Sequence, residues 1–133
     1  DADTKAFNQI MNAFALPKGN EAEKSIRSKA IQEATKYAIE IPFKVMQTAY
    51  ASMEVIKAMA KVGNPNSVSD AGVGALCVRS AVMGAFMNVR INAAGYDDKS
   101  FVEDIVARGK QIENNTIAAE AEILKIVNDK IGI

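Results

Sequence analysis

The sequence has no histidine, no tryptophan and a single cysteine among its 133 residues. Without histidine it has no imidazole metal ligands, no Ser-His or Cys-His nucleophile pairs and no histidine general base. One cysteine excludes an internal disulfide and any metal site built from several thiolates. Proton transfer by this chain would therefore fall to Asp, Glu, Lys, Tyr or a bound water.

An excess of charge of one sign and long apolar runs are also lacking. Sixteen basic residues balance sixteen acidic ones, so there is no basic surplus to indicate a nucleic-acid partner. No uninterrupted apolar run approaches the roughly 20 residues of a membrane span, and no signal peptide is recognisable. We therefore expect a cytoplasmic protein with neither a nucleic-acid nor a membrane partner. The chain begins at Asp1 rather than Met, which leaves open whether it is a complete gene product.

Helical periodicity is what the sequence does have. Hydrophobic residues make up 49% of it, enough for one packed domain over residues 1–133. Apolar residues recur at three- and four-residue spacing in five stretches, separated near Pro17, Pro42, Gly63 and Gly95, and none alternates as a strand would. The sequence predicts an all-α antiparallel bundle of about five long helices, with Pro42 as a boundary or kink.

Several side chains are expected to cap these helices, and others form apolar stripes along them. Asn20 and either Asp97 or Asp98 are placed to cap helices, and residues 67–70 have the form of a capping box. The first helix carries an apolar stripe at helical spacing, and a buried stripe is expected on the second. The stripe on the first helix consists of Phe7, Ile10, Met11 and Phe14, and the stripe on the second of Ile26, Ala30, Ala34, Tyr37 and Ile41.

Residues 63–92 form an unusual predicted helix, GNPNSVSDAGVGALCVRSAVMGAFMNVRIN. One narrow stripe of it holds only small or polar side chains. Its members are Asp70, Gly74, Cys77, Ala81, Ala85, Asn88 and Asn92. The small residues indicate close packing, but polar residues at both ends need partners if they are buried. Periodicity favours structural hydrogen bonds, about two to one as a prior, over a polar cavity.

The loop that opens this helix has two interpretations. Pro and Asn are ordinary turn residues, and Ser67 can cap a helix without any ligand. The exposed N–H groups at a helix start could instead bind an anion such as a ligand carboxylate. The residues alone do not decide between these interpretations.

The segments GNPNSVSDAGVGA and GAFMNVRIN resemble the cyclodeaminase/cyclohydrolase family of folate enzymes. The opening DADTKAFNQIMNAFALPK and the later AIQEATKYAIEIP are similar to the same family, so the resemblance covers nearly the whole chain. Family members usually carry further helices before the Asp-Ala-Asp segment, including a glycine-rich stretch. By this resemblance the chain corresponds to about the C-terminal two-thirds of the domain.

The resemblance implies a reaction that needs no histidine. A cyclodeaminase closes 5-formiminotetrahydrofolate to 5,10-methenyltetrahydrofolate and releases ammonia, and a cyclohydrolase opens that methenyl bridge with water. Neither reaction implies a cofactor or a metal. The implied acid/base is Asp3, whereas residue type alone would favour a capping role for it, which we leave to Asp1. The implied substrate-binding residues are Asn64, Asn66, Ser69, Asp70, Asn88 and Asn92.

Tetrahydrofolate derivatives, polyglutamylated forms among them, are the partners that the resemblance implies, together with a second copy of the chain in at least a dimer. The final helix keeps an apolar stripe at Ile105, Ile112, Ala119, Ile123 and Ile126 that suits packing within or between chains. The sequence does not separate cyclodeaminase from cyclohydrolase. A non-catalytic helical assembly module is the alternative from another class, and such a module should bind no folate.

Overall fold

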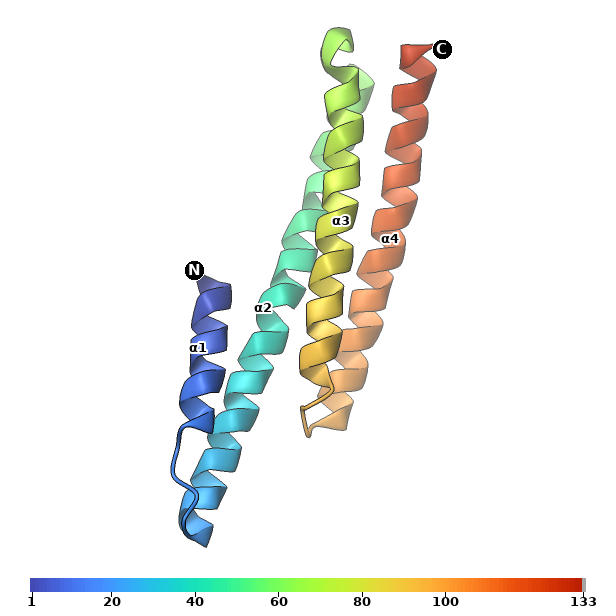
Figure 1. Ribbon diagram of the computed structural model, residues 1–133. Helices are drawn as coiled ribbons and strands as arrows, with labels where there is room; N and C mark the ends of the chain where they lie inside the picture. Colours follow the sequence, from blue (N-terminus) through green and yellow to red (C-terminus); the bar gives the residue numbers. More distant parts are fainter. Residues whose placement is uncertain (133) are drawn as a thin grey trace.

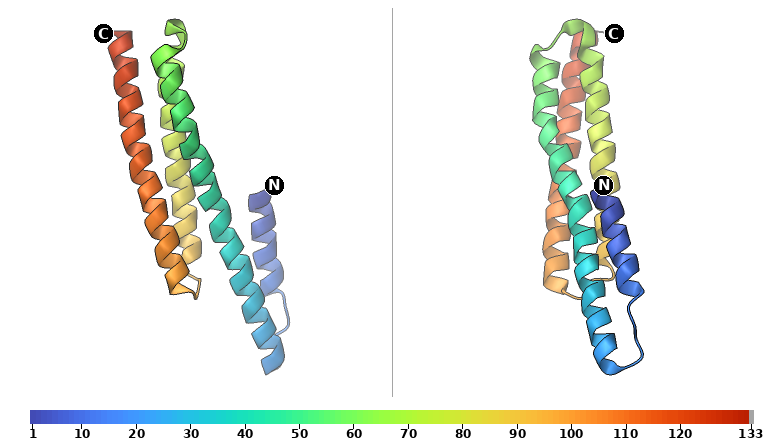
Figure 2. Two further views of the ribbon diagram at one scale, coloured as in Figure 1. Left: turned by 180° about the vertical axis from the view of Figure 1, so that it is seen from behind. Right: turned by 90° about the vertical axis from the view of Figure 1, so that its left-hand side faces the viewer.

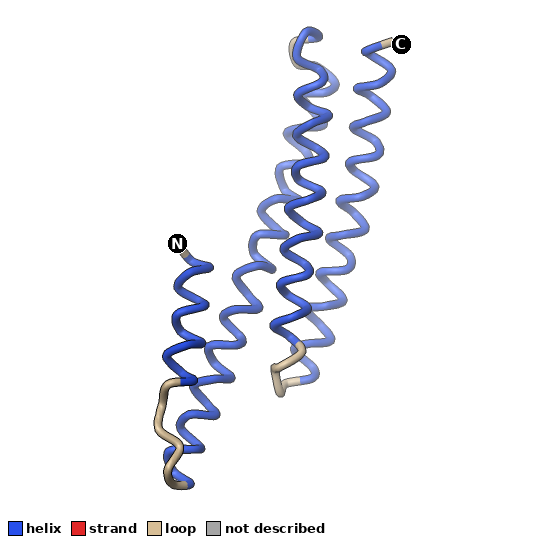
Figure 3. The backbone as a smooth tube through the Cα atoms, in the orientation of Figure 1, coloured by secondary structure: helices blue, strands red, loops and turns tan. Residues whose placement is uncertain are grey.

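The computed structural model describes residues 1–132, which form four α-helices and one short 3-10 helix. They are α1 (Ala2–Phe14), α2 (Glu21–Val62), η1 (Pro65–Ser67), α3 (Val68–Ala93) and α4 (Lys99–Ile131). Within these residues there is no strand (Figure 3). The predicted all-α bundle is confirmed, whereas the expected number of about five long helices is not.

The difference in helix number comes from Pro42, which lies inside α2 instead of ending a helix. Proline has no N–H, so the carbonyl of Ala38, four residues earlier, has no donor within its own helix. The side-chain Nδ2 of Asn92, on α3, donates to this carbonyl at 2.9 Å. The two helices predicted on either side of Pro42 are therefore one continuous helix of 42 residues.

Helices α2, α3 and α4 form the main bundle, and α1 lies along the first part of α2 (Figures 1 and 2). Helix α3 runs antiparallel to its neighbours, because its last turns meet the middle of α2 through the Asn92–Ala38 bond and its first turns meet the end of α4 at Val127. Helices α2 and α4 run parallel, tied by the Lys57–Glu122 ion pair at 2.6 Å.

The connection between α3 and α4 is held to α2 by one side chain. Gln32 donates through Nε2 to the carbonyl of Gly95 at 3.3 Å and accepts the N–H of Asp97 at 2.9 Å. These two bonds join residues more than 60 positions apart in the chain. The end of the bundle at which α3 connects to α4 is therefore held by polar contacts as well as by apolar packing.

The core consists of two hydrophobic clusters stacked along the bundle. The larger buried side chains are Ile39, Phe43, Met46, Val82, Phe86, Val89 and Ile105 in one, and Met53, Val68, Ile123 and Val127 in the other. Two glutamates of α4 are also buried and each has a cationic partner: Glu120 accepts from Arg79 and Glu113 from Lys110, both at 2.6 Å. Paired in this way, the buried carboxylates avoid the cost of an isolated charge.

The buried stripe predicted for the start of α2 is wrong in part, and the apolar stripe of α1, which has helical spacing, is largely exposed. Ile26 is 62% exposed, as is Phe7, and Met11 and Phe14 are more than half exposed. The buried positions of α1 are Ala6 and Ala13. Helix α1 packs chiefly on α2, so it buries one narrow face, and alanines on that face let the two helices approach closely.

The predicted helix starts are confirmed at three of four places. Asp1, Asn20 and Asp98 each accept a backbone N–H from the first turn that follows. Ser67 occupies the N-cap position of α3, but its side chain makes no capping bond. The physical reason is the backbone of Ser67, whose φ of −113° and ψ of 17° continue the turn of η1 and differ from the extended conformation of a capping residue.

One stretch within the described residues, Pro65–Ala93, is long and apolar enough by length and composition to cross a membrane. A core helix of a bundle passes the same test. One side of α3 packs against α2 and α4. Its opposite side carries exposed Val73, Leu76, Met87 and Ile91.

Replacing Gly109 of α4 by alanine should destabilise the bundle. A Cβ there would lie 2.5 Å from Cε2 of Phe86, a ring that is only 2% exposed and has no room to move. We expect Gly109→Ala to lower the free energy of unfolding by about 1–3 kcal/mol, the usual cost of overpacking. Gly74→Ala is the control, because its Cβ would meet Ile56 at an ordinary 3.6 Å. It should be neutral or stabilising in the same urea titration; equal losses for both would contradict the packing described.

Candidate active site

The residues proposed from sequence to bind substrate fall into two groups at opposite ends of α3. The first group lies just before η1, within it and at the start of α3, and comprises Asn64, Asn66, Ser69 and Asp70. Asn88 and Asn92 lie in the last turns of α3. Asp70 and Asn88 are separated along the helix axis by about 27 Å at 1.5 Å per residue. A single chain therefore does not bring these two groups together.

At the first end, the loop is built by its own side chains. The side-chain Oδ1 of Asn64 accepts the N–H of Asn66 at 3.0 Å, which closes the turn that leads into η1. Asn64 and Asp70 also line a cavity of about 390 Å³, whose apolar wall includes Val55, Ile56 and Met59. The amide of Asn64 is therefore partly engaged in the turn, whereas the Asp70 carboxylate is exposed beside the cavity.

At the other end, the two asparagines differ. Asn92 is half-buried and its Nδ2 holds the carbonyl of Ala38, so its main role is the structural hydrogen bond that the periodicity favoured. Asn88, one turn earlier on the same stripe, is exposed. Of the two, Asn88 is the side chain available to a ligand.

Asp3 lies in the first turn of α1 with its side chain exposed. Asp1 performs the capping: its Oδ1 accepts both the backbone N–H of Thr4, at 3.0 Å, and the Thr4 hydroxyl, at 3.1 Å. Assigning the cap to Asp1 was therefore correct. The carboxylate of Asp3 is not used to cap the helix.

A cavity of about 800 Å³ opens beside the start of α1, where Ala2 forms part of its wall. The rest of the wall belongs to α2. Its apolar side chains are Ile41, Val45 and Ala49, and its polar ones are Tyr37, Glu40, Lys44 and Thr48. An apolar floor with a few polar groups at the rim is typical of a site for a small organic ligand, and the volume lies in the range of such sites.

These α2 residues were not predicted as a site from the sequence. Tyr37 and Ile41 were expected in a buried stripe, and both are only half-buried. The signal that could have found them is the mixture on one helix face: Tyr37, Ile41, Lys44 and Thr48 recur at spacings of four, three and four residues. A stripe buried in a core would not carry a lysine.

Helix registers place Asp3 and the end of α3 at the same height along α2. Arg27 of α2 donates to the carbonyl of Phe14 on the antiparallel α1. Eleven residues further along α2 lies Ala38, and eleven residues back along α1 lies Asp3. Because Ala38 also binds Asn92, the candidate acid/base and the last turns of α3 share one level of the bundle, next to the larger cavity.

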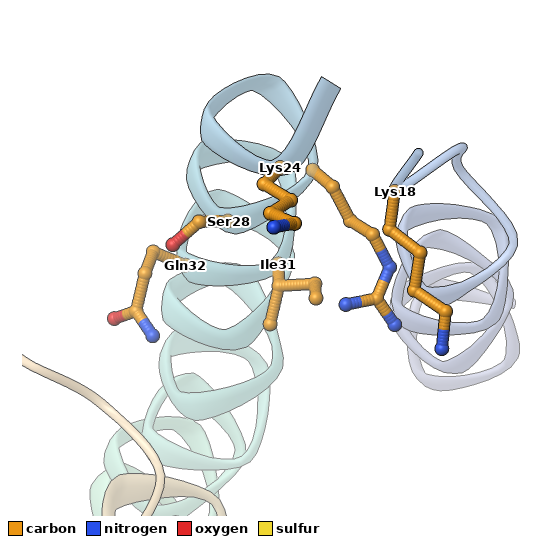
Figure 4. A pocket seen from close by; sticks show the side chains of 6 residues that line it. Lys18, Lys24, Ser28, Ile31 and Gln32 are labelled. Atoms are coloured by element: carbon orange, nitrogen blue, oxygen red, sulfur yellow. The ribbon is translucent and has the colours of Figure 1, made fainter. Parts of the chain in front are cut away.

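A smaller hollow of about 280 Å³ lies near the connection between α1 and α2. Figure 4 shows Lys18, from the connection, and Lys24, on α2, on its two sides. The charges here are largely engaged: Lys24 pairs with Glu21 at 2.7 Å, and the Arg27 guanidinium lies 5.4 Å from the centre of the Phe14 ring. Two of the three cationic side chains at this hollow, Lys24 and Arg27, are therefore already held by neighbouring groups.

Comparison with known proteins agrees with the resemblance read from the motifs. The sequence profile of the formiminotransferase-cyclodeaminase family matches residues 1–111. This chain belongs to the formiminotransferase-cyclodeaminase family. It is 37% identical over 122 residues to the methenyltetrahydrofolate cyclohydrolase of Methylorubrum extorquens, covering 92% of this chain and 56% of that protein. It is 34% identical over 129 residues to the formimidoyltransferase-cyclodeaminase of Dictyostelium discoideum, covering 97% of this chain and 23% of that protein.

The fold is also that of a solved family member. The structure of formiminotetrahydrofolate cyclodeaminase from Thermotoga maritima superposes with a TM-score of 0.81 at 22% identity, over 98% of this chain and 61% of that one. At this identity the likeness shows the fold alone. The chain spans about half the length of the bacterial cyclohydrolase and less of the bifunctional relative.

The Asn92–Ala38 bond can be tested by a double-mutant cycle with Pro42. Asn92→Leu leaves a buried carbonyl without a donor and should lower the free energy of unfolding by about 1–3 kcal/mol. In a Pro42→Ala background the new backbone N–H can bond the same carbonyl, so Asn92→Leu should cost at least 0.5 kcal/mol less there, by the usual size of such couplings.

The control for this cycle is Asn88→Leu, at an exposed position of the same stripe. It should change stability by no more than about 0.5 kcal/mol, while weakening folate binding if Asn88 contacts the ligand. Chemical denaturation of the four cycle members and the control measures all these values. An equal cost of Asn92→Leu in both backgrounds would show that Pro42 and Asn92 are independent.

Proposed function

We propose that this chain catalyses the cyclisation of 5-formiminotetrahydrofolate to 5,10-methenyltetrahydrofolate with release of ammonia. The observation that carries the proposal is the position of Asp3, an exposed carboxylate one residue after Ala2 in the wall of a ligand-sized cavity, in a member of this folate-enzyme family. The larger cavity beside α1 is then the site of the folate ring system, with the apolar side of Val45 and Ile41 beneath it and the polar groups of α2 at its edge.

The chemistry requires one group that moves a proton twice. N10 of the substrate attacks the carbon of the protonated formimino group and must lose its proton, and the resulting amino nitrogen must gain one to leave as ammonia. An ionised Asp3 accepts the first proton and, as the carboxylic acid, returns it to the leaving nitrogen. The formimino and methenyl carbons have the same oxidation state, so the proposed reaction needs no redox cofactor.

A second candidate function is the cyclohydrolase reaction, favoured by the name of the relative that is 37% identical. There the same carboxylate removes a proton from water as it adds to the methenyl carbon, and then protonates the nitrogen that departs. Both reactions pass through a tetrahedral carbon between N5 and N10. The same residues therefore support either one.

The experiment that separates these functions supplies both substrates to the full-length protein. Methenyl absorbance and ammonia are followed separately. Ammonia released together with methenyl formation identifies the cyclodeaminase, and loss of methenyl absorbance without ammonia identifies the cyclohydrolase. Absence of folate binding and of both activities would instead favour the non-catalytic assembly module.

We also propose that the protein acts as at least a dimer on tetrahydrofolate derivatives, including polyglutamylated forms. Support comes from the exposed apolar side chains of α1, α2 and α3, which a second copy would cover. Sedimentation of the intact protein measures its mass directly, and a monomer at working concentration would reject the dimer.

Asp3→Asn tests the acid/base directly. The change keeps the size of the side chain but removes its titratable group, so turnover should fall by roughly 10²- to 10⁴-fold with little change in affinity or stability. Asp1→Ala is the matched control at the adjacent acidic position. Removing that cap should lower stability by about 1 kcal/mol and leave the turnover of the folded protein unchanged. Near wild-type turnover of Asp3→Asn across the pH range would exclude Asp3 and leave Asp70 as the next carboxylate to test.

Filling the larger cavity should weaken folate binding. Val45 is 47% exposed in the cavity wall, and an indole ring there would occupy the space of the ligand. We expect Val45→Trp to raise the dissociation constant of a tetrahydrofolate at least tenfold, or about 1.4 kcal/mol, as measured by calorimetry. Ile26→Trp, at an exposed apolar position of the same helix away from this cavity, is the control and should leave the constant unchanged. Equal affinities for the two variants would place the folate elsewhere.

A further inference from the structure

The wall of the larger cavity beside α1 carries two opposite charges in a fixed order along α2. Among the described residues that line it, Glu40 and Lys44 are the charged ones, and they lie one turn apart on the same helix. Both side chains are exposed, and neither takes part in the ion pairs of the described residues. The carboxylate of Glu40 and the ammonium of Lys44 are therefore both free to meet a ligand in this cavity.

The two charges lie at different distances from the candidate acid/base. Asp3 is at the level of Ala38, by the register that the bond from Arg27 sets between α1 and α2. At 1.5 Å per residue, Glu40 is about 3 Å beyond that level and Lys44 about 9 Å beyond it. Reacting atoms placed at Asp3 are thus near the height of the Glu40 carboxylate, and the ammonium lies more than one turn further along α2.

The opposite direction along α2 offers no cation. The next cavity, of about 480 Å³, lies between α1 and α2 and shares Tyr37 with the larger one. Its charged lining residue among the described residues is Glu33, five residues before Ala38. An anionic group directed that way would meet a like charge, whereas one directed along the larger cavity would meet the ammonium of Lys44.

The tetrahydrofolate of the proposed reaction carries its groups in a matching order. The pterin ring, which contains the reacting N5, has N–H and amino donors that suit a carboxylate. The p-aminobenzoyl group follows on N10, and the glutamate with its two carboxylates comes last. The p-aminobenzoyl group sets the glutamate α-carboxylate about as far from N10 as Lys44 is from the level of Asp3.

We propose that Lys44 binds the glutamate carboxylates of the substrate, which therefore lies along α2 with its pterin beside Tyr37 and Glu40. The p-aminobenzoyl ring then lies between them, on the apolar side chains of Ile41 and Val45. The inference rests on the proposed function and adds to it the direction of the substrate and a residue that recognises its tail. Further glutamates of a polyglutamylated folate continue from this end of the cavity.

Lys44 should act on affinity and not on the chemical step. The glutamate carboxylates keep the same charge from the bound substrate to the transition state, so a contact with them stabilises both equally. Loss of such uniform binding raises KM and leaves kcat unchanged. A purely structural role of Lys44 would instead be insensitive to the charge of the ligand, and this difference can be measured.

Calorimetry with two ligands tests the subsite in the full-length protein. The first ligand is 5-formyltetrahydrofolate, and the second is its diamide, in which both glutamate carboxylates are replaced by neutral carboxamides. At low ionic strength we expect Lys44→Met to weaken binding of the first ligand about two- to fivefold, the size of an ion pair that remains partly exposed to water. Binding of the diamide should not change, and KM for the reacting folate should rise by the same factor at constant kcat.

Two further variants serve as controls. Lys44→Arg keeps the positive charge and should retain most of the affinity. Lys29→Met removes an equal charge from an exposed position of α2 outside the cavity wall and should alter neither dissociation constant.

The outcomes separate the subsite from the proposed function. Equal losses for the two ligands, or no loss for either, overturn the subsite while folate binding by the wild-type protein still stands; this includes the case in which another part of the protein fills the cavity. Wild-type protein that binds neither ligand and is inactive on both folates rejects the proposed function, and the subsite with it.

Discussion

The hydrogen bond from Asn92 to the carbonyl of Ala38 is the contact on which the arrangement of this bundle depends. Pro42 would otherwise leave that carbonyl without a donor in the middle of a 42-residue helix. The bond fixes how far α3 has advanced along α2, and the register of α3 in turn sets which residues meet α4. A buried polar pairing thus specifies an alignment that apolar packing would leave open to slippage.

The same alignment positions the candidate chemistry. Helix α1 is antiparallel to the first part of α2, and its start reaches the height at which Asn92 docks. Asp3, next to Ala2 in the wall of the larger cavity, and the exposed Asn88, one turn before Asn92, therefore lie at about the same level along α2. The loop of Asn64 lies at the far end of the same helix pair.

Much of this fold could be predicted from sequence because its signals are local. Helical spacing gave the fold class, and Asp1, Asn20 and Asp98 could be assigned as caps because each bonds a residue three positions away. Pro42 was not recognised as an interior residue of one continuous helix, because its compensation comes from Asn92, fifty residues later. The exposure of Phe7 could not be predicted, because periodicity identifies an apolar stripe without showing whether a neighbouring helix covers it. The cavity on α2 was missed for the same reason, since only the placement of α1 turns that face into a wall.

Helix α1 has one substantial neighbour, α2, and its larger apolar side chains remain exposed. Elements with few buried contacts open at lower free energy than the core of a protein. The candidate acid/base is thus carried by the segment that we expect to detach first on warming, while α2, α3 and α4 are still assembled. Heating should then abolish the proposed activity before the helical content falls, so that the temperature limit of that activity is set by one short helix and not by the bundle as a whole.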